Sequence, residues 1–170
     1  MPKIVVNYVK YVDLISTFLG KVVMYLVFVM IGILLLGAIT RNILQMPLSW
    51  TVEMAQFIIT GYYIVGGPWS MMQGEQARMD LLYDHFSEKN KARMDVVTNF
   101  CMVFYLTTLL IGSISSTMYA IEYGQRKFST WNPSMIPIKC IMVFGIFLML
   151  LQAFSILFKD IAKVKGIKIS

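Results

Sequence analysis

The chain has 170 residues, of which 58% are hydrophobic and only 14% are charged. Its mean hydropathy of +0.69 is far above that of a water-soluble domain of this size, which excludes a soluble globular protein. The net charge of +6 is explained by membrane topology and attraction to anionic lipid, and it calls for no nucleic-acid partner.

Four stretches contain no Asp, Glu, Lys, Arg or His, and together they make half of the chain: residues 22–40, 54–74, 96–121 and 140–158. A helix rises about 1.5 Å per residue and the hydrocarbon layer is about 30 Å thick, so each stretch is long enough to cross it. We therefore expect an all-α integral membrane protein with four transmembrane helices in one membrane domain, residues 1–170. The remaining segments are too short for a separate catalytic or nucleotide-binding domain.

Residues 1–21 have helical spacing with one narrow polar stripe. The stripe consists of Lys3, Asn7, Lys10, Asp13, Thr17 and Lys21. Such a segment either lies in the headgroup plane as an amphipathic helix or continues the first span as a long tilted helix whose lysines reach water. We favour the interfacial placement.

The second span follows a connection that contains Pro47. Ser49 fits a helix N-cap, Trp50 fits the interfacial aromatic belt, and Glu53 lies where the helix dipole favours an anion. We assign Glu53 a capping or interfacial role ahead of a proton or substrate role. Three glycines in this span allow another helix to approach closely: Gly61, Gly66 and Gly67.

The segment between the second and third spans is half apolar despite its charges, which predicts packing on protein or headgroups. Ser87 fits the N-cap of a helix that begins at Glu88 and runs into the third span. Gly112 and Ser116 of that span form a small-xxx-small pair, which favours close helix contacts in lipid.

The loop from Glu122 to Lys139 contains two prolines and is expected to be non-helical until the fourth span begins. Residues 159–170 form a basic tail, which we expect to lie in the interface on the cytoplasmic side. Eleven of the fifteen Lys and Arg share the side of the two termini, and cytoplasmic loops hold an excess of both residues. Both termini are therefore expected in the cytoplasm.

The sequence offers little for catalysis or cofactor binding. No span has an ionisable group near its centre, and the single histidine, His85, leaves no ligand pair for haem and no metal cluster. Cys101 and Cys140 lie in or at the edge of spans, so we interpret both as small packing residues. We expect no enzyme activity and no cofactor in this chain, and a function exerted through its surfaces.

A family resemblance is carried by Arg41, by the run Leu48-Ser49-Trp50-Thr51-Val52-Glu53, by Gly66-Gly67, and by the run Gly74-Glu75-Gln76-Ala77-Arg78-Met79-Asp80-Leu81-Leu82. In order, spacing and four-span length, these residues resemble the small membrane subunit of tripartite ATP-independent periplasmic (TRAP) transporters, the DctQ-like family, including its sialic-acid branch. The resemblance covers most of the chain, with its motifs concentrated in residues 41–82.

The resemblance implies a bacterial inner-membrane complex with a soluble periplasmic binding protein and a large multi-span subunit. The large subunit would move an organic acid, such as sialic acid or a C4-dicarboxylate, with sodium by an elevator motion. Sodium and substrate would bind the large subunit, while this chain would enlarge the fixed scaffold. Candidate docking residues for the binding protein are Arg41, Asn42, Gln45, Gln125, Arg126 and Lys127. Candidate interface or structural residues are Trp50, Glu53, Gly61, Gly66, Gly67, Arg78, Asp80, Gly112 and Ser116.

Other interpretations stay open at this point. The docking residues also fit solvated loops or headgroup contacts, and Arg78 with Asp80 also fits an exposed ion pair. An autonomous four-helix carrier or exporter is the alternative function, although its usual carboxylate is missing from residues 22–40. A membrane oxidoreductase would need paired cysteines or histidines.

Overall fold

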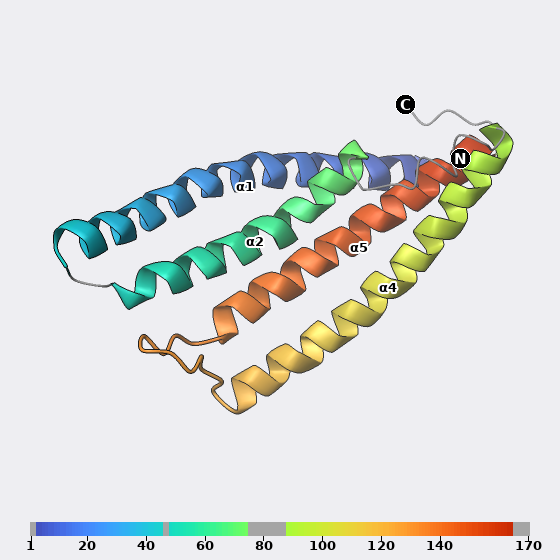
Figure 1. Cartoon of the computed structure of the whole chain (residues 1–170). Helices are drawn as coiled ribbons and strands as arrows, with labels where there is room; N and C mark the ends of the chain where they lie inside the picture. The colour runs from blue at the N-terminus through green and yellow to red at the C-terminus, as the bar shows by residue number, and fades with distance from the viewer. Residues whose placement is uncertain (1–2, 46–47, 75–87, 165–170) are drawn as a thin grey trace.

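The computed structural model describes residues 3–45, 48–74 and 88–164, and this part of the chain is helical apart from short connections. The helices are α1 (Lys3–Ile43), α2 (Ser49–Gln73), α4 (Glu88–Glu122) and α5 (Ile136–Val164). In Figure 1 they lie side by side in the order α1, α2, α5, α4. α5 packs against all three others, with a smaller contact to α1. The all-α prediction is confirmed.

The helices alternate in direction, so the bundle has two distinct ends (Figure 1). The terminal end carries the first residues of α1 and the last residues of α5. The loop end carries the connection from α1 to α2 and the loop 123–135. α2 and α5 consequently run parallel to each other, and α1 and α4 run in the opposite direction.

Three helices are long and apolar enough to cross a membrane: α1 over Val5–Ile43, α4 over Arg93–Glu122, and α5 over its full length. α2 is less hydropathic because glycine, tyrosine, threonine and proline replace aliphatic residues along it. Its 25 residues still measure about 37 Å, which is enough to span a bilayer. Length and composition thus support three of the four predicted spans.

α1 is one unbroken helix of 41 residues. This continuity differs from the favoured interfacial placement of residues 1–21 and supports the alternative of a helix that continues the first span. Residues 3–43 contain no proline that would end the helix. In addition, Asp13 and Ser16 bind residues of α5, so this part of the polar side faces protein instead of water.

The ends of α2 and α5 differ in detail from the predictions. Leu48 is the N-cap of α2 and no side chain caps this helix, so the N-cap assigned to Ser49 is wrong. α5 begins at Ile136, which makes the predicted non-helical loop too long. Pro137 is tolerated in the first turn because a backbone N–H there has no helical partner. At the start of this turn, the Ser134 hydroxyl oxygen accepts a hydrogen bond from the Ile136 N–H at 3.3 Å.

α5 also continues to Val164, so half of the expected basic tail, residues 159–164, is helical. Residues 165–170 lie outside the described residues. The same holds for the predicted N-cap Ser87 and for His85.

Glycines set the spacing between neighbouring helices. A Cβ on Gly145 of α5 would overlap the Ile64 side chain and lie 3.1 Å from the Ile64 carbonyl oxygen on α2. A Cβ on Gly37 of α1 would lie 2.7 Å from Thr51 Oγ1 on α2. These approaches bring helix backbones close together, as small residues do in membrane bundles.

The glycines selected from the sequence differ in their surroundings. A Cβ on Gly67 would lie 3.0 Å from Met149 Sδ, whereas one on Gly61 or Gly66 would make ordinary contacts at 3.8 and 3.6 Å. A Cβ on Gly112 would meet nothing within 4 Å. Gly112 is therefore exposed on α4, and its small size serves no contact within the described part of the chain.

Gly145→Ala should lower the free energy of unfolding by about 1–3 kcal/mol, because the added methyl group forces the Ile64 backbone away. Gly112→Ala is the matched control, since its methyl group enters open space. It should be neutral or stabilise by up to about 1 kcal/mol through helix propensity. Denaturant unfolding in detergent micelles, followed by circular dichroism, compares the two; equal responses would contradict the close approach of α2 and α5.

Candidate functional site

A buried polar cluster joins α1 to α5. Asp13 accepts hydrogen bonds from Lys159 Nζ at 2.6 Å, Gln152 Nε2 at 2.9 Å and Ser155 Oγ at 3.4 Å. Gln152 Oε1 in turn accepts the Ser16 hydroxyl at 2.8 Å. Gln152 and Ser155 have no exposed surface, and Ser16 is almost as deeply buried. We call these five residues the α1–α5 polar cluster.

The α1–α5 polar cluster is internally satisfied. A polar group buried without a partner is costly, so each member depends on the others for its hydrogen bonds. The Asp13–Lys159 ion pair is about a third exposed, which moderates its own contribution. The contact extends one turn along α1, where the Tyr8 hydroxyl donates to the Leu151 carbonyl oxygen at 3.0 Å.

A second polar contact joins α4 to α5 at the terminal end. Asp160 is 5% exposed and accepts hydrogen bonds from Asn99 Nδ2 and, at 3.2 Å, from Lys163 Nζ. Beyond it, α4 presents buried and half-buried residues at alternating intervals of three and four: Val103, Leu106, Leu110, Ser113, Thr117 and Ala120. This spacing is typical of left-handed helix pairs. Met71 of α2 and Ala153 of α5 complete the apolar cluster around Val103 and Leu106.

The loop 123–135 folds as a short hairpin at the loop end. The Lys127 N–H donates to the Pro133 carbonyl oxygen at 3.0 Å, and the Met135 N–H donates to the Gln125 carbonyl oxygen at 3.0 Å. Lys127 Nζ also donates to Gln56 Oε1 of α2 at 2.6 Å. The hairpin is thus an ordered structure attached to α2.

The structure places the six predicted docking residues at the loop end, in two groups. Arg41 and Asn42 lie at the end of α1, and Gln45 follows with a positive φ of 55°. Gln125, Arg126 and Lys127 form the first arm of the hairpin, where an adjacent Phe128 is fully exposed. The loop end therefore presents cations beside an exposed aromatic ring. Sequence reasoning did not select Phe128, although an aromatic residue next to two cations in a loop was a visible signal.

Glu53 is 8% exposed, and its Oε2 atom has no hydrogen-bond partner in the described part of the chain. Glu53 is the fifth residue of α2, just beyond its first turn, and its capping or interfacial role stays a prediction. Gly61 lies against Ile141 and Gly67 against Met149 in the parallel α2–α5 pair. If these pairings are extended toward the start of α2, Glu53 lies at the same height in the bundle as the loop residues that precede α5.

The remaining residues selected from the sequence differ in their exposure and in their position in the bundle. Trp50 is half-buried in the first turn of α2, and Ser116 is exposed on α4. Cys101 and Cys140 are both exposed, so neither packs in the core as predicted. Arg78 and Asp80 lie outside the described residues. Within residues 3–45, 48–74 and 88–164, no group of three or more His, Cys, Asp and Glu could hold a metal ion.

Sequence reasoning missed the α1–α5 polar cluster. Two signals pointed to it: Gln152 is the one side-chain amide in the uncharged stretch 140–158, and Asp13 is the one acid before Glu53. Neither signal identified the partner, because the two residues are 139 positions apart.

A family model described as "Tripartite ATP-independent periplasmic transporters, DctQ component" matches residues 30–163. The matched range begins within α1 and includes all of α2 and α4 and nearly all of α5. No curated protein and no solved structure matches the chain.

Gln152→Ala should destabilise the bundle by about 1–3 kcal/mol, because it leaves Ser16 and Asp13 each short of a hydrogen bond. Lys163→Ala serves as the control, because its side chain is 68% exposed and its ion pair should contribute no more than about 1 kcal/mol. A double-mutant cycle with Asp13→Ala should give a coupling energy of about 0.5–3 kcal/mol. Additive effects would show that the cluster does not act as a unit.

Proposed function

Because the chain belongs to the DctQ component family of TRAP transporters, a family of transporter membrane subunits and not of enzymes, we propose that it serves as a fixed scaffold. In this proposal a large membrane subunit moves substrate against the scaffold, and a periplasmic binding protein delivers the substrate. The match over residues 30–163 is the observation that carries the proposal.

The exposed surfaces of the outer helices support a scaffold role. Only 6% of the most apolar stretch of α1 and 11% of that of α4 are buried within the bundle, against 33% for α5. Apolar surfaces of this extent face lipid or another membrane protein. α1 and α4 lie at opposite edges of the layer in Figure 1, so the chain offers two broad faces to neighbours.

We propose that α2 is the fourth span. It lies between α1 and α5, and close glycine contacts join it to both. In this arrangement α1 and α5 cover two sides of α2, which compensates for the lower hydropathy of α2 itself. With four spans in a bacterial inner membrane, the distribution of Lys and Arg puts both termini and the terminal end in the cytoplasm.

Sodium and the organic acid, of the sialic acid or C4-dicarboxylate type, are proposed to bind the large subunit. Two carboxylates near the terminal end support that division of labour, whereas the Oε2 atom of buried Glu53 has no hydrogen-bond partner in the described residues. Asp13 is neutralised by Lys159, and Asp160 is paired with Lys163. Buried carboxylates that already have cationic partners have little to offer a sodium ion.

The loop end is the proposed docking surface for the binding protein. Arg41, Arg126 and Lys127 make it cationic, and Phe128 adds an exposed aromatic ring. Arginine and aromatic residues are enriched at protein interfaces, and cations favour an acidic partner. The partner proposed here is therefore an acidic surface with an apolar recess.

The scaffold proposal is tested by reconstituting the full chain in vesicles alone and together with its large subunit. We expect uptake of organic acid driven by a sodium gradient only in the second case, with the two chains recovered together in mild detergent. Uptake by vesicles that hold this chain alone would overturn the proposal and favour an autonomous carrier. Glu53→Gln should leave the pH profile of transport unchanged; an altered profile would assign Glu53 a titrating role.

Arg126→Glu should weaken docking of the binding protein about fivefold and reduce its salt dependence, because one favourable charge becomes repulsive. Arg93→Glu is the control, since Arg93 is exposed on α4 at the terminal end. Affinity of the binding protein for the reconstituted complex, measured at two salt concentrations, tests this. Unchanged affinity for the Arg126 variant would remove the hairpin from the docking surface.

A further inference from the structure

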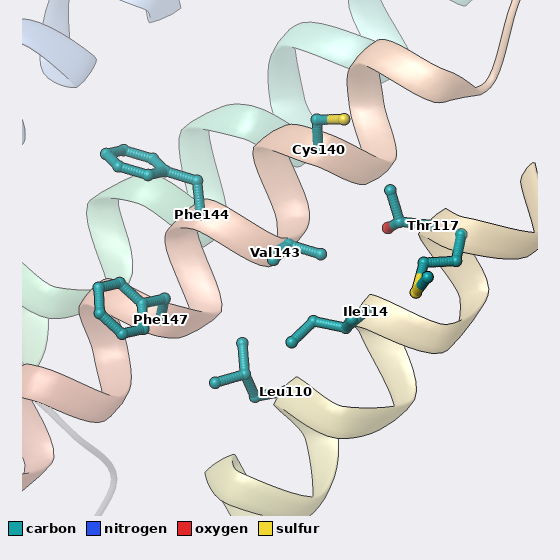
Figure 2. Close-up of a pocket in the computed structure, with 8 residues that line it drawn as sticks. Leu110, Ile114, Thr117, Cys140, Val143, Phe144 and Phe147 are labelled. Atoms are coloured by element: carbon teal, nitrogen blue, oxygen red, sulfur yellow. The ribbon is translucent and has the colours of Figure 1, made fainter. Parts of the chain in front are cut away.

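An apolar groove of about 410 Å³ lies between α4 and α5. Figure 2 shows Cys140 and Thr117 near one end of it and Phe147 at the other, with Ile114 of α4 directed toward α5. The lining is hydrocarbon apart from the Thr117 hydroxyl, the Cys140 thiol and the Met118 thioether. That hydroxyl already donates to the Ser113 carbonyl oxygen at 2.7 Å, so the groove offers little to a polar ligand.

Lys139 bridges the two helices next to the Cys140 end of the groove. From α5, its Nζ donates to the Ser116 carbonyl oxygen at 3.1 Å and to Ser116 Oγ at 2.9 Å on α4. A third hydrogen bond reaches Gln125 Oε1 at 2.7 Å. The Lys139 carbonyl oxygen also lies 3.5 Å from Oγ1 of Thr117, which lines the groove, so Lys139 lies at the Cys140 end of the groove.

The surroundings of Lys139 lack an anion. All three of its acceptors are neutral, and within the described residues no carboxylate lies within ion-pair distance of its Nζ. In addition, no described hydrogen bond uses the hydrogen of the Ser116 hydroxyl. The ammonium group uses its three N–H donors on these acceptors, so it would attract a phosphate through its charge, and the Ser116 hydroxyl would donate the hydrogen bond to a phosphate oxygen.

The depth of Lys139 matches a headgroup region. It lies in the first turn of α5, close to the end of the helix. At the same end, Tyr119 and Tyr123 stack at 4.4 Å between ring centroids and are both exposed, and Trp131 is exposed in the hairpin. Tyrosine and tryptophan are enriched where a membrane meets water. The groove thus runs from the headgroup level into the hydrocarbon layer.

We propose that the α4–α5 groove binds one acyl chain of an anionic phospholipid whose phosphate lies against Lys139 and Ser116. The lipid belongs to the leaflet at the loop end. It supplies both features that the site lacks, an apolar filling for the groove and a negative charge for the ammonium group. The proposal depends on placement in a membrane and not on the scaffold role.

The chemistry of the site favours an anionic phospholipid over an apolar helix of a neighbouring protein. The groove is lined by apolar side chains, and the Lys139 ammonium group at its end has only neutral acceptors in the described residues. A phospholipid supplies hydrocarbon and a negative charge in one molecule, whereas an apolar helix supplies only the first.

The test uses the full chain in vesicles of phosphatidylethanolamine with phosphatidylglycerol that carries a photoreactive acyl chain. Mass spectrometry should find the label concentrated on residues 110–118 and 140–147, above the level on the exposed face of α1. Lys139→Gln should reduce this labelling about fivefold, the weakening expected when one lysine beside an anionic headgroup is neutralised. Lys127→Gln is the control, since Lys127 bonds to α2, and it should leave the labelling unchanged.

Three outcomes would overturn the proposal. Labelling no higher in the groove than on α1 would show that the groove holds no specific lipid. Equal labelling by a diacylglycerol probe, or by the Lys139 variant, would show that the phosphate contact does not exist. A Cys140–Cys140 disulfide between chains, formed in place of lipid labelling, would assign the groove to a second copy. Circular dichroism and micelle elution check that the variants are folded.

Discussion

A polar side chain inside an apolar bundle must find its partner in protein, because the surrounding lipid offers none. The α1–α5 polar cluster meets this requirement with five residues from two helices that are adjacent only at the terminal end. It fixes the first part of the continuous helix α1 against α5, although the composition of that part also suits a headgroup-bound segment. It also places α5 at the centre of the layer, since α5 supplies the partners for polar residues of both α1 and α4.

The membrane class and the number of helices follow from the sequence because charges are expensive in lipid, so their absence over long stretches is informative. The placement of residues 1–21 does not follow in the same way. A polar stripe looks the same whether it faces water or another helix. The hydrogen bond from Gln152 to Asp13 shows that this part of the stripe faces another helix. Gln152 lies 139 positions from Asp13, so no local sequence pattern connects the two residues.

The candidate site residues likewise divide into those whose position follows from the local sequence and those whose contacts depend on a neighbouring helix. The loop residues Arg41 and Arg126 were selected for charge and position, and both lie exposed at the loop end. Contacts of the glycines within the chain could not be ranked from the sequence, because every glycine in a span permits close approach, but only the neighbouring helix determines where it occurs. Gly145 meets the backbone of α2, whereas Gly112 faces open space. Glu53 was assigned to a helix start, and it lies near the start of α2, but its burial was not expected.

The central position of α5 also has a consequence for how the protein is made. α5 follows α1, α2 and α4 in the chain, yet α4 packs mainly on it and Asp13 depends on it. During translation α1 and α2 can pair with each other first, whereas α4 is made before its main partner. Asp13 and Ser16 likewise gain their hydrogen-bond partners only once α5 has been made.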